Sequence, residues 1–196
     1  MIVGRKKEIE LLRKVYGSGQ AELVAIYGME RVGKTYLVDN VFEGKMIFRH
    51  AGMSPIESSS MSGRSSMKKQ LKHFYNSLVQ QGMKKSKQPA DWLEAFYLLE
   101  SFIESKDDGG RMVVFLDELP WLDTPRSGFI SAFEGFWNSW ACCRKNLMLI
   151  VCGSATTWMV NKLINNYGGL YGRVTCEIRL STFNLGECEE FFKSKK

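Results

Sequence analysis

Hydrophobic positions along the chain fall into two patterns, short continuous runs and stripes at helical spacing. Three segments are continuous apolar runs, which are typical of strands buried on both faces of a parallel sheet. They are Leu23–Tyr27, Met112–Leu116 and Leu147–Cys152. Lys45–His50 and Val174–Leu180 predict two further strands. Polar and apolar residues alternate in Val174–Leu180, as expected of a strand at a sheet edge.

Helical stripes separate these runs. Their apolar residues recur every three or four positions, the spacing that aligns side chains on one face of a helix. Because strands and helices alternate along the chain, we expect an α/β fold with three layers and a mostly parallel five-stranded sheet. The predicted helices cover Glu8–Tyr16, Leu37–Phe42, Met67–Gln81, Asp91–Ser105, Phe129–Trp140 and Phe183–Phe192.

Two stretches are expected to lack regular structure. Residues 51–66 hold seven serines together with Gly52, Pro55 and Gly63, a composition typical of flexible loops. Residues 193–196 follow the last predicted helix and are expected to fray.

Composition indicates an ordinary α/β domain and excludes several classes of protein. The 196 residues are 44% hydrophobic, which is enough for one buried core and too much for a disordered chain. The five cysteines include no Cys-x-x-Cys pair, which argues against a disulfide scaffold. Two histidines argue against a His-rich metal site. The longest apolar run, Leu147–Cys152, is too short to span a membrane, so we expect a cytoplasmic protein without a membrane partner.

The net charge of +6 comes from one segment. Ser58–Ala90 contains seven Lys or Arg residues and no Asp or Glu, so the rest of the chain is close to neutral. A concentration of basic residues can bind the phosphates of nucleic acid or of membrane lipids. It can equally be a solvated helix face with its loop, and the sequence leaves both interpretations open. The seven residues are Arg64, Lys68, Lys69, Lys72, Lys84, Lys85 and Lys87.

Residues Gly28–Thr35 match the phosphate-binding pattern G-x-x-x-x-G-K-[ST]. They follow a predicted strand and precede a predicted helix, which is the context that makes this pattern credible. Glycines let backbone amides approach phosphate oxygens, and the amino end of a helix favours anions. Lys34 is expected to neutralise charge on the β- and γ-phosphates, and the Thr35 hydroxyl to bind Mg²⁺. The other residues expected to contact the nucleotide here are Gly28, Met29, Glu30, Arg31, Val32, Gly33 and Tyr36.

An acidic pair ends the third predicted strand. Asp117 and Glu118 come directly after the run that ends at Leu116, at the sheet edge where parallel strands bind ligands. Asp117 is expected to hold Mg²⁺, and Glu118 to orient or activate the water that attacks the γ-phosphate. A water-activating carboxylate favours hydrolysis over phosphorylation of a small metabolite.

Two further residues are candidates to act on the γ-phosphate. Ser154 follows the fourth predicted strand in Cys152-Gly-Ser154, where its hydroxyl can either sense the γ-phosphate or cap a helix. Arg173 ends Leu170-Tyr-Gly-Arg173 after a flexible Gly168-Gly169 pair. Its guanidinium can either stabilise charge during phosphoryl transfer or lie in an exposed turn.

Together these motifs resemble the prokaryotic group of P-loop ATPases called archaeal ATPases, which is similar to the AAA+ and STAND ATPases. The resemblance covers nearly the whole chain. Members of this group usually continue into a helical lid and a further domain. We therefore expect residues 1–196 to form one nucleotide-binding domain without a lid or an effector domain, either as a piece of a longer protein or as a protein that has no lid. The resemblance also implies the strand order 5-1-4-3-2, in which the Gly-Ser strand separates the loop strand from the Asp-Glu strand. The matching motifs are Val3-Gly-Arg-x-x-Glu8, Gly28–Thr35, Phe115–Leu122, Cys152-Gly-Ser154 with Met159, Leu170–Arg173 and Leu180–Glu187.

The resemblance implies roles for individual residues as well. Gly4 and Arg5 are expected near the adenine or ribose, Ser154 as the γ-phosphate sensor and Arg173 as an arginine finger. The phosphate loop departs from the family by having Glu30 where arginine is common. An acid there should repel a triphosphate unless its side chain points outward or pairs with a cation.

We therefore expect an ATPase switch that uses ATP and Mg²⁺ and acts on an attached module or a protein partner. Two other functions remain open. One is a nucleic-acid-binding module with residues 58–90 as its contact surface. The other is a small-molecule kinase, which the presence of Glu118 after Asp117 disfavours.

Overall fold

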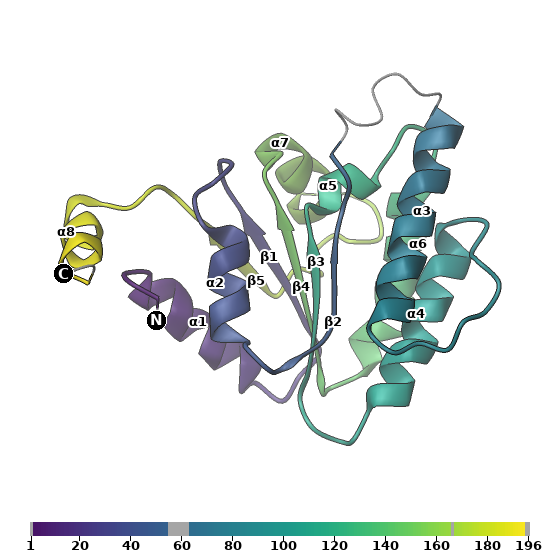
Figure 1. Ribbon diagram of the computed structural model, residues 1–196, viewed down its shortest axis with the longest axis horizontal. Helices are drawn as coiled ribbons and strands as arrows, with labels where there is room; N and C mark the ends of the chain where they lie inside the picture. The colour runs from purple at the N-terminus through teal and green to yellow at the C-terminus, as the bar shows by residue number, and fades with distance from the viewer. Residues whose placement is uncertain (1, 55–62, 166, 195–196) are drawn as a thin grey trace.

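In the computed structural model of the protein, residues 2–54, 63–165 and 167–194 are described. The strands form a five-stranded parallel sheet in the order β2-β3-β4-β1-β5, with helices on both faces (Figure 1). The predicted α/β class, layers and strand order are confirmed. The strands are β1 (Glu22–Tyr27), β2 (Met46–Ala51), β3 (Met112–Asp117), β4 (Leu147–Gly153) and β5 (Cys176–Arg179).

Two groups of long helices cover the sheet. α1 (Lys6–Tyr16) and α2 (Lys34–Val41) lie on one face, while α3 (Gly63–Gln80), α4 (Trp92–Lys106) and α6 (Phe129–Ser139) lie on the other (Figure 1). Successive side chains of a strand point to opposite faces, so each central strand contributes to two hydrophobic cores. This arrangement is why the central strands are continuous apolar runs rather than alternating ones.

The two cores divide the residues of β1 between them. Leu23 and Ala25 pack in the core under α3, α4 and α6. Val24 and Ile26 pack in the core under α1 and α2. All six residues of β1, and likewise all of β3, are buried. Both strands therefore end in fixed positions at the carboxyl edge of the sheet, where their next residues form the candidate site.

Shorter helices follow the strands at several points. The sequence did not predict the four of these helices that have three to six residues, because so few residues cannot show a helical period. α8 lies apart from the sheet, near the N-terminal segment (Figure 1). These elements are α5 (Leu119–Leu122), the 3-10 helix η2 (Ala141–Cys143), α7 (Thr156–Trp158), the π-helix η3 (Met159–Ile164) and α8 (Leu185–Lys193).

Several predicted boundaries were wrong. The loop predicted over residues 51–66 is shorter, because β2 includes Ala51 and α3 already begins at Gly63. Residues 55–62 and 195–196, and with them part of the predicted loop and of the fraying end, lie outside the described residues. Burial of Ser66 shows the reason for the early helix start, since tertiary packing overrides the weak helix propensity of serine.

The last strand and the last helix also differ from their predicted extents. β5 covers only four of the residues predicted as strand, because it pairs with β1 alone over Val24–Tyr27. α8 begins at Leu185 rather than Phe183, because Asn184 caps it together with Glu187 in a capping box. Across the described residues, no helix combines the length and apolarity that a membrane span requires.

Candidate functional site

The loop Gly28–Gly33 joins the carboxyl end of β1 to the amino end of α2. At Gly28, a Cβ atom would fall 2.1 Å from the carbonyl oxygen of Leu180, beside β5. Gly33 is the N-cap of α2 with φ at 92°, and a Cβ there would meet none of the described atoms within 4 Å. Close packing therefore requires the first glycine. The second has a left-handed backbone beside open space, an arrangement suited to an anion at a helix amino end.

Lys34, the first residue of α2, folds back over the loop. Its ammonium donates hydrogen bonds to the carbonyl oxygens of Gly28 at 3.0 Å and Met29 at 2.8 Å. The residue is only 5% exposed, and among the described residues its ammonium forms no ion pair. A buried cation held by carbonyl oxygens alone remains available to an incoming anion.

Thr35 and Asp117 meet at the carboxyl edge of the sheet. Thr35 lies in the first turn of α2 and Asp117 ends β3. The Thr35 hydroxyl donates a hydrogen bond to Asp117 Oδ2 at 2.7 Å, and Oδ1 accepts one from the Glu118 amide at 3.0 Å. Hydroxyl and carboxylate oxygens are ligands that Mg²⁺ prefers. This pair, together with phosphate oxygens, fits the metal that the sequence predicted.

Glu118 and Ser154 are joined by two hydrogen bonds. Glu118 Oε2 accepts one from the Ser154 amide at 3.0 Å and one from its hydroxyl at 2.8 Å. Glu118 also has a left-handed backbone, with φ at 46°, a conformation that concentrates at functional sites. The alternative that Ser154 caps a helix is wrong, because α7 begins at Thr156 with Ala155 in the N-cap position.

The N-terminal segment lies beside the phosphate loop. The Arg5 guanidinium is buried and donates to the carbonyl oxygens of Val32 at 3.2 Å and Ser181 at 2.5 Å. The Arg5 amide donates to Glu187 Oε1 at 2.9 Å. At Gly4, a Cβ atom would fall 2.9 Å from Glu187 Cγ. Arg5 therefore joins the phosphate loop, the segment after β5 and α8.

Glu187 is held in its charged form. Burial acts to raise the pKa of its carboxyl group, but hydrogen bonds from the backbone amides of Arg5 and Asn184 outweigh burial and lower the pKa. The carboxylate therefore stabilises both the amino end of α8 and the turn at Arg5.

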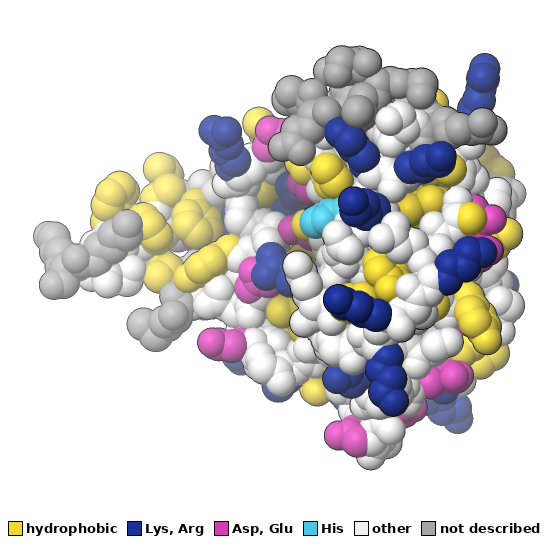
Figure 2. Space-filling model, turned by 45° about the vertical axis from the view of Figure 1, so that its right-hand side comes forward, with side chains coloured by type: hydrophobic (Ala, Val, Ile, Leu, Met, Phe, Trp, Pro, Cys, Tyr) yellow, Lys and Arg dark blue, Asp and Glu magenta, His cyan; other side chains and the backbone are white. Residues whose placement is uncertain are grey.

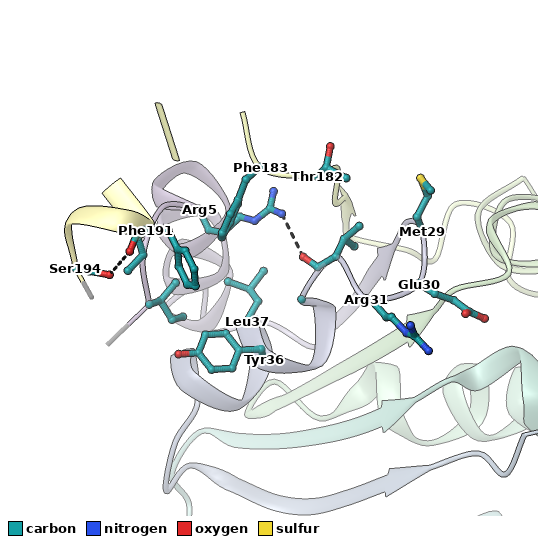
Figure 3. Close-up of a pocket in the computed structure, with 14 residues that line it drawn as sticks. Arg5, Met29, Glu30, Arg31, Tyr36, Leu37, Thr182, Phe183, Phe191 and Ser194 are labelled. Atoms are coloured by element: carbon teal, nitrogen blue, oxygen red, sulfur yellow. Dashed lines mark hydrogen bonds between the residues drawn. The ribbon is translucent and has the colours of Figure 1, made fainter. Parts of the chain in front are cut away.

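A cavity of about 630 Å³ lies between the phosphate loop, the N-terminal segment and α8 (Figure 3). Phe183 and Phe191 line it, and the Arg5 guanidinium carbon lies 4.7 Å from the centre of the Phe183 ring. The side chains of Glu30 and Arg31 point away from these rings (Figure 3), and both are exposed. Apolar walls with a few polar groups are typical of a site for a planar organic ligand.

Some residues of this cavity were not predicted from the sequence. Of the residues that the sequence predicted to contact the nucleotide, Arg5 and Tyr36 line the cavity, whereas Gly4 does not. Phe183 and Phe191 were considered only as parts of a motif and a helix. Their signal was the pair of aromatic residues after the last strand, but aromatic residues at such spacing are equally expected in a packed core.

Arg173 lies at the opposite end of the sheet from the phosphate loop. Two residues later, the Thr175 amide donates to the Leu23 carbonyl at 2.9 Å, near the amino end of β1. Four residues of strand, about 13 Å, separate Leu23 from Tyr27, which precedes the loop. Burial raises the pKa of the Cys142 thiol in η2, before β4, and the charge of Arg173 opposes that rise. The structure does not bring Arg173 together with the phosphate loop of the same chain.

Comparison with known sequences gives matches over the whole chain. A family model described as an ATPase domain predominantly from Archaea matches residues 2–196. An uncharacterized protein of Methanocaldococcus jannaschii is 27% identical over 194 residues, which are 98% of this chain and 38% of that protein. An uncharacterized ATP-binding protein of the same organism is 43% identical over 49 residues, 25% of this chain and 83% of that protein. The chain thus spans well under half the length of the first relative.

Comparison with solved structures shows the same fold in longer proteins. The Walker-type ATPase of Pyrococcus abyssi has a TM-score of 0.68 at 22% identity, over 98% of this chain and 57% of its own. A STAND protein with a tetratricopeptide repeat sensor from Pyrococcus horikoshii has a TM-score of 0.51 at 19% identity, over 100% and 25%. Cdc6p of Pyrobaculum aerophilum has a TM-score of 0.60 at 14% identity, over 97% and 48%.

Proposed function

Because the chain belongs to the family of ATPase domains found predominantly in Archaea, we propose that it binds ATP with Mg²⁺ and hydrolyses it as a molecular switch. The observation that carries the proposal is the 2.7 Å contact between Thr35 Oγ1 and Asp117 Oδ2, beside the buried ammonium of Lys34. A pair of metal ligands and a cation at the amino end of a helix are what binding of a metal–triphosphate requires.

In the proposed complex, Lys34 exchanges its two loop carbonyls for oxygens of the β- and γ-phosphates. The exchange is favourable because a phosphate oxygen carries formal charge and a carbonyl oxygen does not. Thr35 and Asp117 hold Mg²⁺, which when bound neutralises charge on the β- and γ-phosphate oxygens. The amides at the start of α2, from Gly33 onward, donate to the phosphates.

Glu118 is the proposed residue that orients the attacking water, and Ser154 positions the Glu118 carboxylate. In the structure, both hydrogen bonds from Ser154 reach the same carboxylate oxygen of Glu118. A γ-phosphate oxygen would compete for the Ser154 hydroxyl and leave that carboxylate oxygen with one bond fewer. Glu118 then gains the capacity to accept a proton from water. Ser154 thereby reports the presence of the γ-phosphate to Glu118.

The cavity beside Gly33 is the proposed site of the adenine base and ribose. Its aromatic walls, Phe183 and Phe191, offer apolar surface to a planar ring. The buried Arg5 guanidinium fixes the position of one wall, since it lies over Phe183 and donates to the loop carbonyl of Val32. Base binding and the conformation of the phosphate loop are therefore linked through Arg5.

The proposed output of the switch is a movement of an attached or partner module. Arg5 contacts both the phosphate loop and Glu187 of α8, so a change at the loop reaches α8 through one residue. Longer relatives support this part of the proposal, since one structure of the same fold has a tetratricopeptide repeat sensor in its chain. The proposed arginine finger, Arg173, acts in the site of a neighbouring copy, because it lies far from its own loop.

The test is ATP turnover by the chain in the presence of Mg²⁺, measured as phosphate release, together with ATP binding measured by calorimetry. Lys34→Ala is expected to weaken binding and turnover, because it removes the buried cation. Glu118→Gln is expected to keep binding but lower kcat by ~10²-fold or more, the usual contribution of a positioned acid or base. Chelation of Mg²⁺ by EDTA is expected to abolish turnover.

Glu43→Gln is the matched control, because Glu43 is an exposed acid just after α2. It makes the same change of charge as Glu118→Gln outside the site and is expected to leave kcat unchanged. Failure of the folded parent to bind ATP at saturating Mg²⁺ would contradict the proposal. So would parental turnover by Glu118→Gln.

A further inference from the structure

Six lysines on α3 and the segment after it form a surface that the proposed ATPase site does not use. All six are exposed, and within the described part of the chain none of them forms an ion pair. Figure 2 shows the face that α3 and α4 bring forward, with basic side chains spread over its centre and most acidic ones toward its margins. We define this lysine face as Lys68, Lys69 and Lys72 of α3 with Lys84, Lys85 and Lys87 of the following segment.

Tyr75 brings the two groups of lysines together. Its hydroxyl donates to the Ser86 carbonyl at 2.6 Å and accepts from the Ser86 amide at 2.9 Å. Tyr75 lies about one turn beyond Lys72 on α3, and Ser86 lies between Lys85 and Lys87. The segment therefore folds back along the helix, and lysines that are distant in sequence share one surface.

This concentration of charge has no role in holding α3 in place. The inner face of the helix buries Leu71, Phe74 and Leu78, which is sufficient to dock it on the sheet. Six ammonium groups that form no ion pair with the described carboxylates repel one another, so the outer face alone is electrostatically unfavourable. A bound polyanion would offset this repulsion and release counterions.

We propose that the lysine face binds the phosphate backbone of double-stranded nucleic acid without recognising its sequence. Lysine presents a compact point charge that suits phosphate oxygens, whereas base recognition mostly uses bidentate side chains. Among the described residues of α3 and the following segment, no Phe, Tyr or Trp side chain is exposed, and the one exposed ring is the imidazole of His73. This disfavours single strands, because their bases stack on aromatic rings.

An anionic membrane is the competing partner for a basic surface. Peripheral membrane helices pair a basic face with exposed large apolar side chains that enter the bilayer. In the described part of α3 and the segment up to Ala90, none of the large hydrophobic side chains is exposed, and the exposed Leu93 and Tyr97 belong to the neighbouring helix α4. The chemistry of the lysine face therefore fits a phosphodiester backbone better than a lipid surface.

The test measures binding of the full chain to a short fluorescein-labelled DNA duplex by anisotropy over a series of salt concentrations. The parent is expected to bind with an affinity that falls linearly in log K against log salt. The triple variant Lys68→Glu, Lys69→Glu, Lys72→Glu is expected to reduce the slope by ~0.9 for each phosphate contact removed. The triple variant Lys84→Glu, Lys85→Glu, Lys87→Glu is expected to behave in the same way, and it serves as the second test if the first variant is unstable.

The control is the triple variant Lys7→Glu, Lys14→Glu, Lys145→Glu, which makes the same change of net charge at exposed lysines elsewhere. It is expected to keep most of the parental slope, and each variant is checked for a parental unfolding midpoint. Equal losses in the control and the lysine-face variants would overturn the proposal. So would the absence of duplex binding at low salt, or binding to phosphatidylserine vesicles in its place.

Discussion

Two glycines of the phosphate loop are required for different physical reasons. Gly28→Ala would force a Cβ to 2.1 Å from the Leu180 carbonyl oxygen, whereas Gly33→Ala would meet none of the described atoms within 4 Å. Gly33→Ala is expected to cost the left-handed backbone conformation alone, about 1 kcal/mol. Gly28→Ala adds steric overlap with the Leu180 carbonyl oxygen, directly after β5, a further ~1–3 kcal/mol. Urea unfolding of both variants checks the order, and an equal loss at the two positions would show that the segment at Leu180 moves aside freely.

His50 provides a prediction of pH dependence. It is 2% exposed on the side of β2 that faces α3, with Nδ1 2.9 Å from Ser77 Oγ. Burial and, to a smaller extent, the charge of the neighbouring His73 together lower the pKa of His50 to about 3. In the unfolded chain the pKa is about 6.5. As the pH falls below this value, the unfolded state takes up a proton that the folded state does not.

Stability is therefore expected to fall between about pH 6.5 and pH 3, by at most ~1.4 kcal/mol per pH unit from His50. His50→Phe keeps a ring in the core and is expected to flatten this part of the stability profile, measured by urea unfolding at each pH. His73→Gln, at an exposed position, is the control and should retain most of the slope. A slope unchanged by His50→Phe would assign the acid sensitivity to other groups.

At the scale of elements, Gln70 joins α3 to the segment after β2 and to α5, the helix that follows Asp117 and Glu118. Its Nε2 donates to the carbonyl oxygens of Met53 and Trp121, both at 2.9 Å, and its Oε1 accepts from the Met53 amide at 3.1 Å. Trp121 belongs to α5, which begins directly after Glu118. The Gln70 side chain therefore connects α3 to the backbone that positions Glu118, the proposed general base.

Gln70→Ala is expected to lower the free energy of unfolding by about 1–3 kcal/mol, because it leaves buried backbone groups without partners. It is also expected to lower kcat, since α5 loses a fixed attachment. Gln80→Ala, at an exposed position of the same helix, is the control for helix propensity. Chemical denaturation and phosphate release measure the two effects. Identical behaviour of the two variants would remove Gln70 from any positioning role.

At the scale of the whole molecule, the position of Arg173 predicts that turnover requires contact between copies of the chain. Arg173→Ala is expected to lower kcat by ~10³-fold or more, as for an arginine finger, while ATP binding persists. Mixed with Lys34→Ala, which keeps its own Arg173, it is expected to regain turnover. The intact phosphate loop of one variant then receives the arginine of the other.

The measurement is phosphate release as a function of the mixing ratio, with each variant alone as the baseline. Lys34→Ala mixed with Glu118→Gln tests the specificity of rescue. Each of these variants lacks a residue of its own catalytic site and already has Arg173, so no neighbour can restore turnover by supplying Arg173. A kcat of Arg173→Ala equal to that of the parent would exclude the finger, and failure of the first mixture to recover would exclude its action between copies.

Local patterns in the sequence determined most of the fold. Continuous apolar runs marked the central strands, because a strand covered by helices on both faces excludes polar side chains from both. Gly28–Thr35 was evident because its glycines and Lys34 are adjacent in the chain. The meeting of Thr35 with Asp117 also follows from the sequence, because the loop after the first strand and the end of the third strand lie at the same carboxyl edge of one parallel sheet.

Only the tertiary structure decided how segments far apart in the chain meet. It brings Ser154 within hydrogen-bond distance of Glu118 and Arg5 within hydrogen-bond distance of Glu187 of α8. It also places Arg173 at the end of the sheet opposite the phosphate loop. These outcomes depend on strand register and on the paths of short turns and helices, which have too few residues for a periodic pattern. Distances across the fold arise from the packing of all its elements together, and no local pattern of residues encodes them.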